Sequence, residues 1–156
     1  MKPEEIQMQM KNLRDYFNRS TRPLQEEHSG FTPREGQFSV VGQVAHTAQT
    51  IEWFFDAAFS NQWDMDFEGL EKKTRACTSL AAAREWFNRA VDKAIQAAGA
   101  HTAEEWASPF PPNPIMGEIP RSSIIGAVVD HTAHHRGALT VYQRLLGLTP
   151  PMPYME

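Results

Sequence analysis

The chain has 156 residues, of which 41% are hydrophobic and 22% charged, a composition typical of one globular domain with a buried core. Its formal net charge of −4 and its lack of a Lys/Arg cluster argue against a nucleic-acid or anionic-membrane partner. Because the N-terminus lacks a signal peptide and no apolar run is long enough to span a bilayer, we expect residues 1–156 to form one cytoplasmic domain.

The first third of the chain predicts two helices separated by a loop. A helix is expected over about Pro3–Arg19, with proline in its first turn and an apolar stripe on one face. Two prolines and two glycines within Ser20–Gln37 predict a loop. Ser39 is a suitable N-cap for a second helix over about Val40–Ser60, and Phe38 could pack against it as a hydrophobic staple.

The middle of the chain predicts a connection, a third helix and a short extra helix. Asn61–Glu71 is polar with a few aromatic residues and is expected to be a connection. An Ala-rich helix follows over about Ser79–Ala98, with Gly99 as its C′ residue. The segment Thr102–Glu105 matches a capping box, which indicates a short helix after the third long one.

Four prolines within 109–114 exclude regular structure before the last helix, which is expected from about Arg121 to Gly147. No run of alternating β-branched residues competes with the helical pattern. The sequence therefore predicts an all-α four-helix bundle, with a short extra helix in the connection between helices three and four.

Three of the six histidines lie within the segment His131–His135 of this last helix. His131 and His135 are four positions apart, so their imidazoles project from one face and can share a metal ion, whereas His134 lies off that face. With Cys77 as the single cysteine, a disulfide and a multi-thiolate zinc site are excluded, so a metal would rest on histidine and oxygen. Both histidines lie on the apolar stripe that is expected to face the core. Seven residues of this stripe fall within a helical sector of about 80°: Ile124, Val128, His131, His135, Leu139, Tyr142 and Leu146. The alternative to metal binding is that each buried imidazole is hydrogen-bonded to a neighbouring helix.

A third ligand would have to come from His28, His46 or His101. His28 and His101 lie in predicted loops, where a solvated side chain is the simpler expectation. His46 lies in the middle of the second helix, but about 150° from the centre of that helix's strongest apolar stripe. Helical periodicity alone does not decide which side of the helix faces the core.

The sequence resembles the DinB/YfiT-like superfamily in two blocks, about Phe38–Phe59 and Ser122–Tyr154. The first block is Phe-Ser-Val followed by a mid-helix histidine. The second is His-Thr-Ala-His-His-Arg-Gly followed by Leu-Gly-Leu-Thr-Pro-Pro-Met-Pro-Tyr. The resemblance implies a four-helix bundle, commonly dimeric, with a divalent metal held by His46, His131 and His135. This chain has Ala138 after the Arg-Gly pair, where many members have glutamine.

Three imidazole ligands leave a metal, zinc or nickel by preference, with open positions for water or a small-molecule substrate. Metal-dependent hydrolysis is the main hypothesis, because a metal-bound water has a lowered pKa and can act as a nucleophile. Related branches of the superfamily are thiol-dependent transferases and isomerases, so metal-dependent thiol S-transfer or isomerisation is the alternative, and a non-enzymatic metal-binding dimer is a third possibility. Glu52 and Tyr142 are candidate catalytic groups, but a solvent-exposed or simple packing role is the preferred expectation for each.

The second helix also predicts a self-association surface. Its aromatic residues are spread further around the helix than one core-facing stripe requires. These residues are Trp53, Phe54, Phe55 and Phe59. Because exposed apolar patches commonly mark interfaces, we expect a homodimer built partly on this helix, with burial inside one chain as the alternative.

Overall fold

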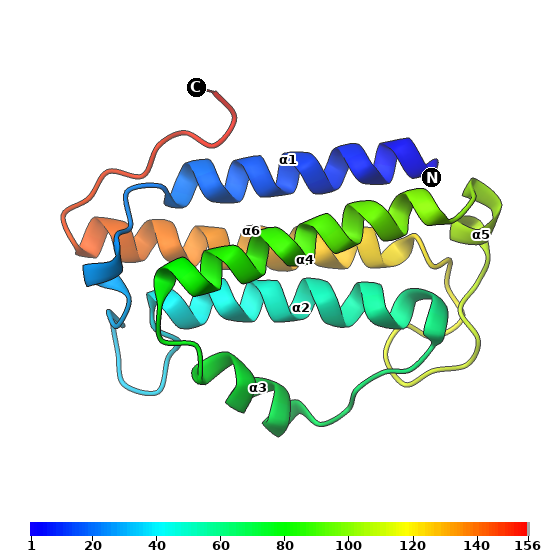
Figure 1. Ribbon diagram of the computed structural model, residues 1–156, viewed down its shortest axis with the longest axis horizontal. Helices are drawn as coiled ribbons and strands as arrows, with labels where there is room; N and C mark the ends of the chain where they lie inside the picture. The colour runs from blue at the N-terminus through cyan, green and yellow to red at the C-terminus, as the bar shows by residue number, and fades with distance from the viewer. Residues whose placement is uncertain (156) are drawn as a thin grey trace.

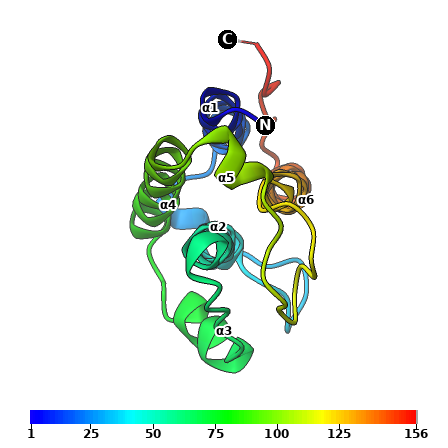
Figure 2. The ribbon, with the colours of Figure 1, turned by 90° about the vertical axis from the view of Figure 1, so that its right-hand side faces the viewer.

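A computed structural model describes residues 1–155, in which four long helices run side by side (Figure 1). These are α1 (Pro3–Thr21), α2 (Val40–Ser60), α4 (Leu80–Ala100) and α6 (Ser123–Leu145). Three short elements complete the fold: η1 (Glu26–His28), α3 (Phe67–Arg75) and α5 (Ala103–Ala107). Viewed along the bundle, the four long helices surround a common core and α3 lies outside it, beneath α2 (Figure 2). The predicted all-α four-helix bundle with an extra helix after the third long helix is confirmed.

Local capping explains where the helices begin. Ser39 Oγ accepts a hydrogen bond from the Gly42 amide at 3.2 Å, and α2 has the predicted bounds. Ser79 Oγ accepts from the amide of Ala82 at the start of α4 in the same way. Such side chains satisfy amides that have no partner within the first helical turn. At the same end of the bundle, α6 stops at Leu145, two residues before Gly147, whose φ of 76° is incompatible with a continuing helix (Figure 1).

Two predictions for the middle of the chain are wrong. The connection expected over Asn61–Glu71 contains the start of α3, which Asp66 caps by accepting from the Gly69 amide at 2.9 Å. Only Thr74 of this helix is buried, and its nine residues include just two large apolar side chains, Phe67 and Leu70, too short a pattern to stand out in the sequence. Gly99, expected as the residue after the third helix, lies inside α4.

The crossover made by α3 determines the direction of the helices. In Figure 1, α2 and α4 run in the same direction, and α3 carries the chain back along the bundle between them. Because α3 lies outside the bundle, α2 is the long helix on which it mainly packs. By contrast, α2 packs against α3, α4 and α6. As a result α2 is buried around most of its circumference in its first half, and polar residues there face other helices rather than solvent.

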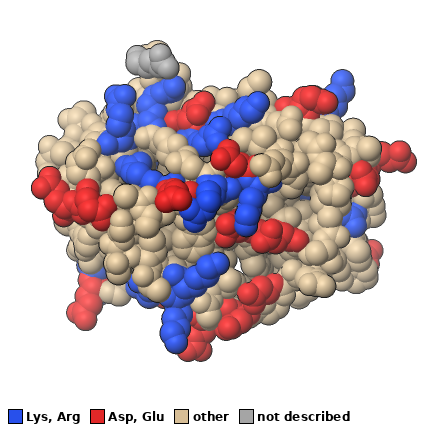
Figure 3. Space-filling model, viewed as in Figure 1, with Lys and Arg blue, Asp and Glu red and all other residues tan. Residues whose placement is uncertain are grey.

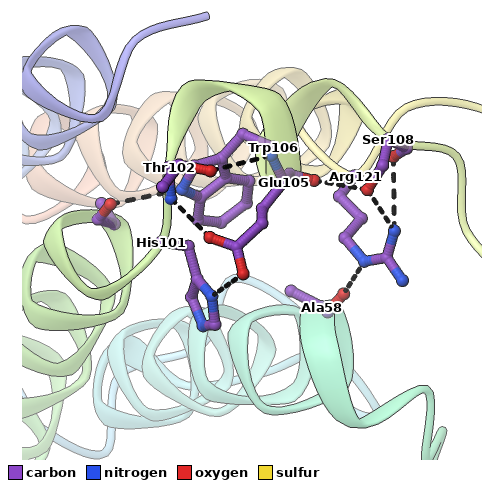
Figure 4. Close-up of polar contacts among 8 residues, drawn as sticks. Ala58, His101, Thr102, Glu105, Trp106, Ser108 and Arg121 are labelled. Carbon is purple, nitrogen blue, oxygen red and sulfur yellow. Dashed lines mark hydrogen bonds and ion pairs between the residues drawn. The ribbon is translucent and has the colours of Figure 1, made fainter.

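A cluster of polar contacts ties the connection after α4 to the end of α2 (Figure 4). Arg121 Nε donates to the carbonyl of Ala58 at 3.0 Å, and Arg121 Nη1 donates to Ser108 Oγ at 2.7 Å. The indole of Trp106, fully buried, donates to the carbonyl of Ala98 at 3.2 Å and so satisfies a C-terminal carbonyl of α4. These contacts fix the start of α6 against α2, the helix pair that carries the histidines.

The aromatic side of α2 finds partners within the chain. Trp53 makes an edge-to-face contact with Trp63, with ring centroids 4.9 Å apart, and also lies beside Phe67 of α3. Phe59 is stacked on His101 at a centroid distance of 3.4 Å. The aromatic residues of α2 therefore have partners in the connection before α3, in α3 and in the segment between α4 and α5, and the homodimer stays a prediction.

The surface seen in Figure 3 intersperses Lys and Arg side chains with Asp and Glu, and among the described residues on that face no stripe of one sign crosses it. Within residues 1–155, none of the helices combines the length and apolar character needed to cross a membrane. Neither observation identifies a partner.

Candidate metal centre

The structure brings His46 of α2 together with His131 and His135 of α6. His131 Nε2 lies 3.2 Å from His46 Nε2 and 3.1 Å from His135 Nε2. One ligand atom from each of the three residues lies within 4.8 Å of the others, so the group could hold a metal ion. The four-residue spacing on α6 therefore does place two imidazoles on one face, and the face of α2 that carries His46 is the one turned toward α6.

The hydrogen bonds of His135 fix which of its nitrogens carries the proton. Its Nδ1 is bonded to Oε1 of Gln43, and an amide oxygen only accepts, so His135 Nδ1 is the protonated donor. In the neutral imidazole Nε2 then has a free lone pair, and it points at the other histidines. Three Nε2 atoms packed this closely cannot all be satisfied by one another, because a neutral imidazole has a single N–H. A shared cation explains the arrangement, and the residues present therefore fit a divalent metal.

A hydrogen-bonded chain supports the His135 ring. Gln43 Nε2 donates to the Tyr142 hydroxyl at 3.2 Å, and that hydroxyl donates to the carbonyl of Phe38 at 3.0 Å. Gln43, His135 and Tyr142 are all buried. Such outer contacts orient a metal-binding imidazole and raise its basicity. Tyr142, one of the two candidate catalytic groups, is thereby a positioning residue held through both its donor and its acceptor capacity.

Burial keeps the three imidazoles neutral. Desolvation, reinforced by the neighbouring imidazoles, lowers the pKa of His135 to about 3 and that of His131 to about 4. Desolvation also lowers the pKa of His46, while the carboxylate of Glu71 acts in the opposite direction. Near pH 7 the three imidazoles are therefore neutral, and each has one nitrogen lone pair to offer to a cation.

A surface cavity of about 600 Å³ adjoins this cluster, and of the three clustered histidines it is His135 that lines the cavity. Its lining includes His135 and His134 from α6, Glu71 and Arg75 from α3, and residues of the loop that precedes α2. His134 lines the cavity but does not belong to the three-histidine group. The cavity therefore brings a small molecule of ordinary size beside the group, at His135.

Sequence comparison decides the family. The DinB family model matches residues 7–156, nearly the whole chain. This chain belongs to the DinB family. No curated protein matches the sequence significantly.

Solved structures similar to this DinB protein share its fold at low sequence identity. A DinB-like protein from Bacillus subtilis has a TM-score of 0.70 and 18% identity, with 97% of this chain and 99% of that chain covered. A DinB-like protein from Bacillus cereus has a TM-score of 0.69 and 20% identity, with 90% of each chain covered. A mycothiol-dependent maleylpyruvate isomerase has a TM-score of 0.71 and 14% identity, with 89% of this chain but 61% of that chain covered. At these identities the likeness shows a common fold.

The remaining sequence candidates lie away from the histidine group. Glu52 accepts from the Trp86 indole at 2.9 Å and pairs with Lys93 at 3.4 Å, both on α4. His28 lies in η1 with its side chain 16% exposed, and its Nδ1 accepts from the Gln25 amide at 2.9 Å. His101 is likewise not simply solvated, because it stacks on α2 through Phe59 and pairs with Glu105 at 3.5 Å.

Sequence reasoning missed three residues that the site of this DinB protein contains. Gln43 lies three residues before His46 in the apolar half of α2, and that polar interruption was a usable signal. Glu71 and Arg75 reach the cavity from α3, whose helix was not predicted. No local pattern indicates that this exposed, charged helix faces a site.

Proposed function

We propose that this chain is a metal-dependent enzyme that activates a low-molecular-weight thiol, with His46, His131 and His135 as the ligands of a divalent transition metal such as zinc or nickel. The observation that carries the proposal is the convergence of three Nε2 atoms beside an accessible cavity. Structural zinc sites are generally closed by four protein ligands, so three ligands and an adjoining cavity favour a site that takes substrate.

When bound, the metal would lower the pKa of a thiol in the cavity and hold it as the nucleophilic thiolate. The chain's own residues prepare that site. Gln43 holds His135 in the tautomer that presents Nε2, and Phe38 stacks on His46 with ring centroids 5.0 Å apart. Ala138 and Val141 contribute apolar surface to part of the cavity.

Thiol activation is favoured over hydrolysis by the carboxylates available. Among the described residues that line the cavity, Glu71 is the one carboxylate, and its Oε1 is paired with Arg75 at 2.7 Å. Metal binding lowers the pKa of a bound water and of a bound thiol alike, but a free thiol starts near about 8.5 and water near about 15.7, so the thiol depends less on an additional base. The shared fold with a mycothiol-dependent isomerase also supports a thiol reaction. Hydrolysis is the second candidate, and Glu71, released from Arg75, would be its base.

Cobalt substitution tests the ligand set and the thiol together. The Co²⁺-loaded protein is titrated with 2-mercaptoethanol, and a thiolate-to-cobalt charge-transfer band in the near ultraviolet is expected. His131→Ala is expected to lose the metal, whereas His134→Ala, a matched change in the same helix, is expected to retain it. Retention of metal by His131→Ala and its loss from His134→Ala would overturn the ligand assignment. A metal-loaded protein that gives no thiolate band at saturating thiol would contradict thiol activation.

A further inference from the structure

Two charged side chains of α3 lie at the cavity that leads to the histidines. Arg75 Nε donates to Glu71 Oε1 at 2.7 Å, and the guanidinium lies 4.9 Å from the centroid of the Phe38 ring. Phe38 in turn stacks on His46. One aromatic ring therefore separates the Arg75 guanidinium from a candidate metal ligand, and both charged residues line the same cavity as His135.

The Glu71–Arg75 pair is not needed to hold the fold. It is an i, i+4 pair on an outer helix, with side chains 52% and 47% exposed, and pairs of this kind contribute little to stability. The Nη groups of Arg75 make no hydrogen bond to the described residues, so they are available to an incoming anion. Arginine presents its donors in a planar fork that matches a carboxylate.

The charge of the loaded site points to the kind of ligand. Three neutral imidazoles leave the two positive charges of a divalent metal uncompensated, while Glu71 and Arg75 cancel each other. A thiolate would neutralise one of those charges. A ligand that also carries a carboxylate would supply the second negative charge and could place it on the Arg75 fork.

We infer that Arg75 is a specificity-determining residue that binds the carboxylate of a carboxylate-bearing thiol, with the sulfur directed toward the three histidines. This inference rests on the proposed function, because it assigns the second anchor of the same ligand. The apolar wall of Ala138 and Val141 suits the hydrocarbon segment between the two anionic ends. His134, which also lines the cavity, is a further polar contact for that ligand.

The test compares two thiols of equal length on the Co²⁺-loaded full chain: 3-mercaptopropionate and its neutral amide, 3-mercaptopropanamide. The charge-transfer band reports binding of each sulfur, independently of any turnover. Wild-type protein is expected to bind the carboxylate about tenfold more tightly, an advantage worth about 1.4 kcal/mol. Arg75→Gln is expected to abolish this preference and leave the affinity for the amide unchanged.

Arg89→Gln is the matched control. Arg89 makes an i, i+4 pair with Glu85 at the same 2.7 Å, but on α4 and away from the cavity lining, so the preference is expected to persist in this variant. Circular dichroism verifies that both variants are folded. Equal wild-type affinity for the two thiols overturns the inference but leaves the proposed function standing. A preference that survives Arg75→Gln also overturns it, because the carboxylate would then be bound by a group other than Arg75. Absence of a band with either thiol means that the proposed function itself has failed.

Discussion

The role assigned to Gln43 makes the most direct prediction about the candidate metal centre. Gln43→Leu removes the acceptor of the His135 Nδ1 proton and the donor to Tyr142, in a side chain that is 8% exposed. Leaving a buried donor unpaired costs about 1–3 kcal/mol, and loss of an outer contact to a metal-binding histidine typically weakens metal binding about 10- to 100-fold. We therefore expect the metal-free variant to be about 2 kcal/mol less stable and its metal affinity to fall at least tenfold.

Two measurements separate these effects. Urea unfolding in the presence of chelator gives the change in stability, and competition with a chromophoric chelator gives the change in metal affinity. Tyr142→Phe is the control, because it leaves the bond between Gln43 and His135 intact and is expected to weaken metal binding by less than Gln43→Leu. Gln43→Glu retains an acceptor and is expected to restore tight binding. Wild-type metal affinity in Gln43→Leu would refute the assigned role of Gln43.

Three further predictions concern the whole chain. Removal of metal by chelation is expected to leave helicity by circular dichroism largely intact, because the four long helices bury a core without it; a global loss of helicity would indicate a structural metal. The metal-free protein is expected to lose stability as the pH falls from about 6.5 toward 3. In that range His131 and His135 bind protons in the unfolded chain, but not in the folded chain, where their pKa values are about 4 and 3. The urea midpoint of a His131→Ala/His135→Ala variant should therefore depend less steeply on pH. Light scattering at micromolar concentration is expected to give the mass of a homodimer, and a monomeric mass would contradict the prediction.

The parts of the site that the sequence predicted are those encoded within one helix. His131 and His135 are four residues apart, and that spacing alone places them on a shared face. The bounds of α2 follow from Ser39 and the residues after it. These features depend on local hydrogen bonds and helical geometry, which do not change with the surroundings.

Helical periodicity did not indicate the parts that depend on which helices surround α2, and His46 was assigned to the site through the family resemblance. His46 lies far from the strongest apolar stripe of α2. That stripe marks one buried side of the helix, and other sides of α2 are buried as well. Because α3, α4 and α6 all pack on α2, more than one side of the helix is buried, and the apolar stripe no longer indicates which side faces the site. Periodicity likewise said nothing about Glu71 and Arg75, because an exposed charged helix has the same pattern whether or not it lines a cavity.

The candidate centre depends on the register between α2 and α6 more than on either helix alone. Gln43 and His46, three residues apart on α2, meet His135 and His131 on α6, so both pairs of contacts are lost together if one helix slides. At 1.5 Å per residue, Arg121 lies about 15 Å along the chain from His131. Its bond to the Ala58 carbonyl nevertheless fixes the same pair of helices at the other end. The contacts around Arg121 therefore help to fix the axial register of α2 and α6, the two helices that supply the candidate ligands.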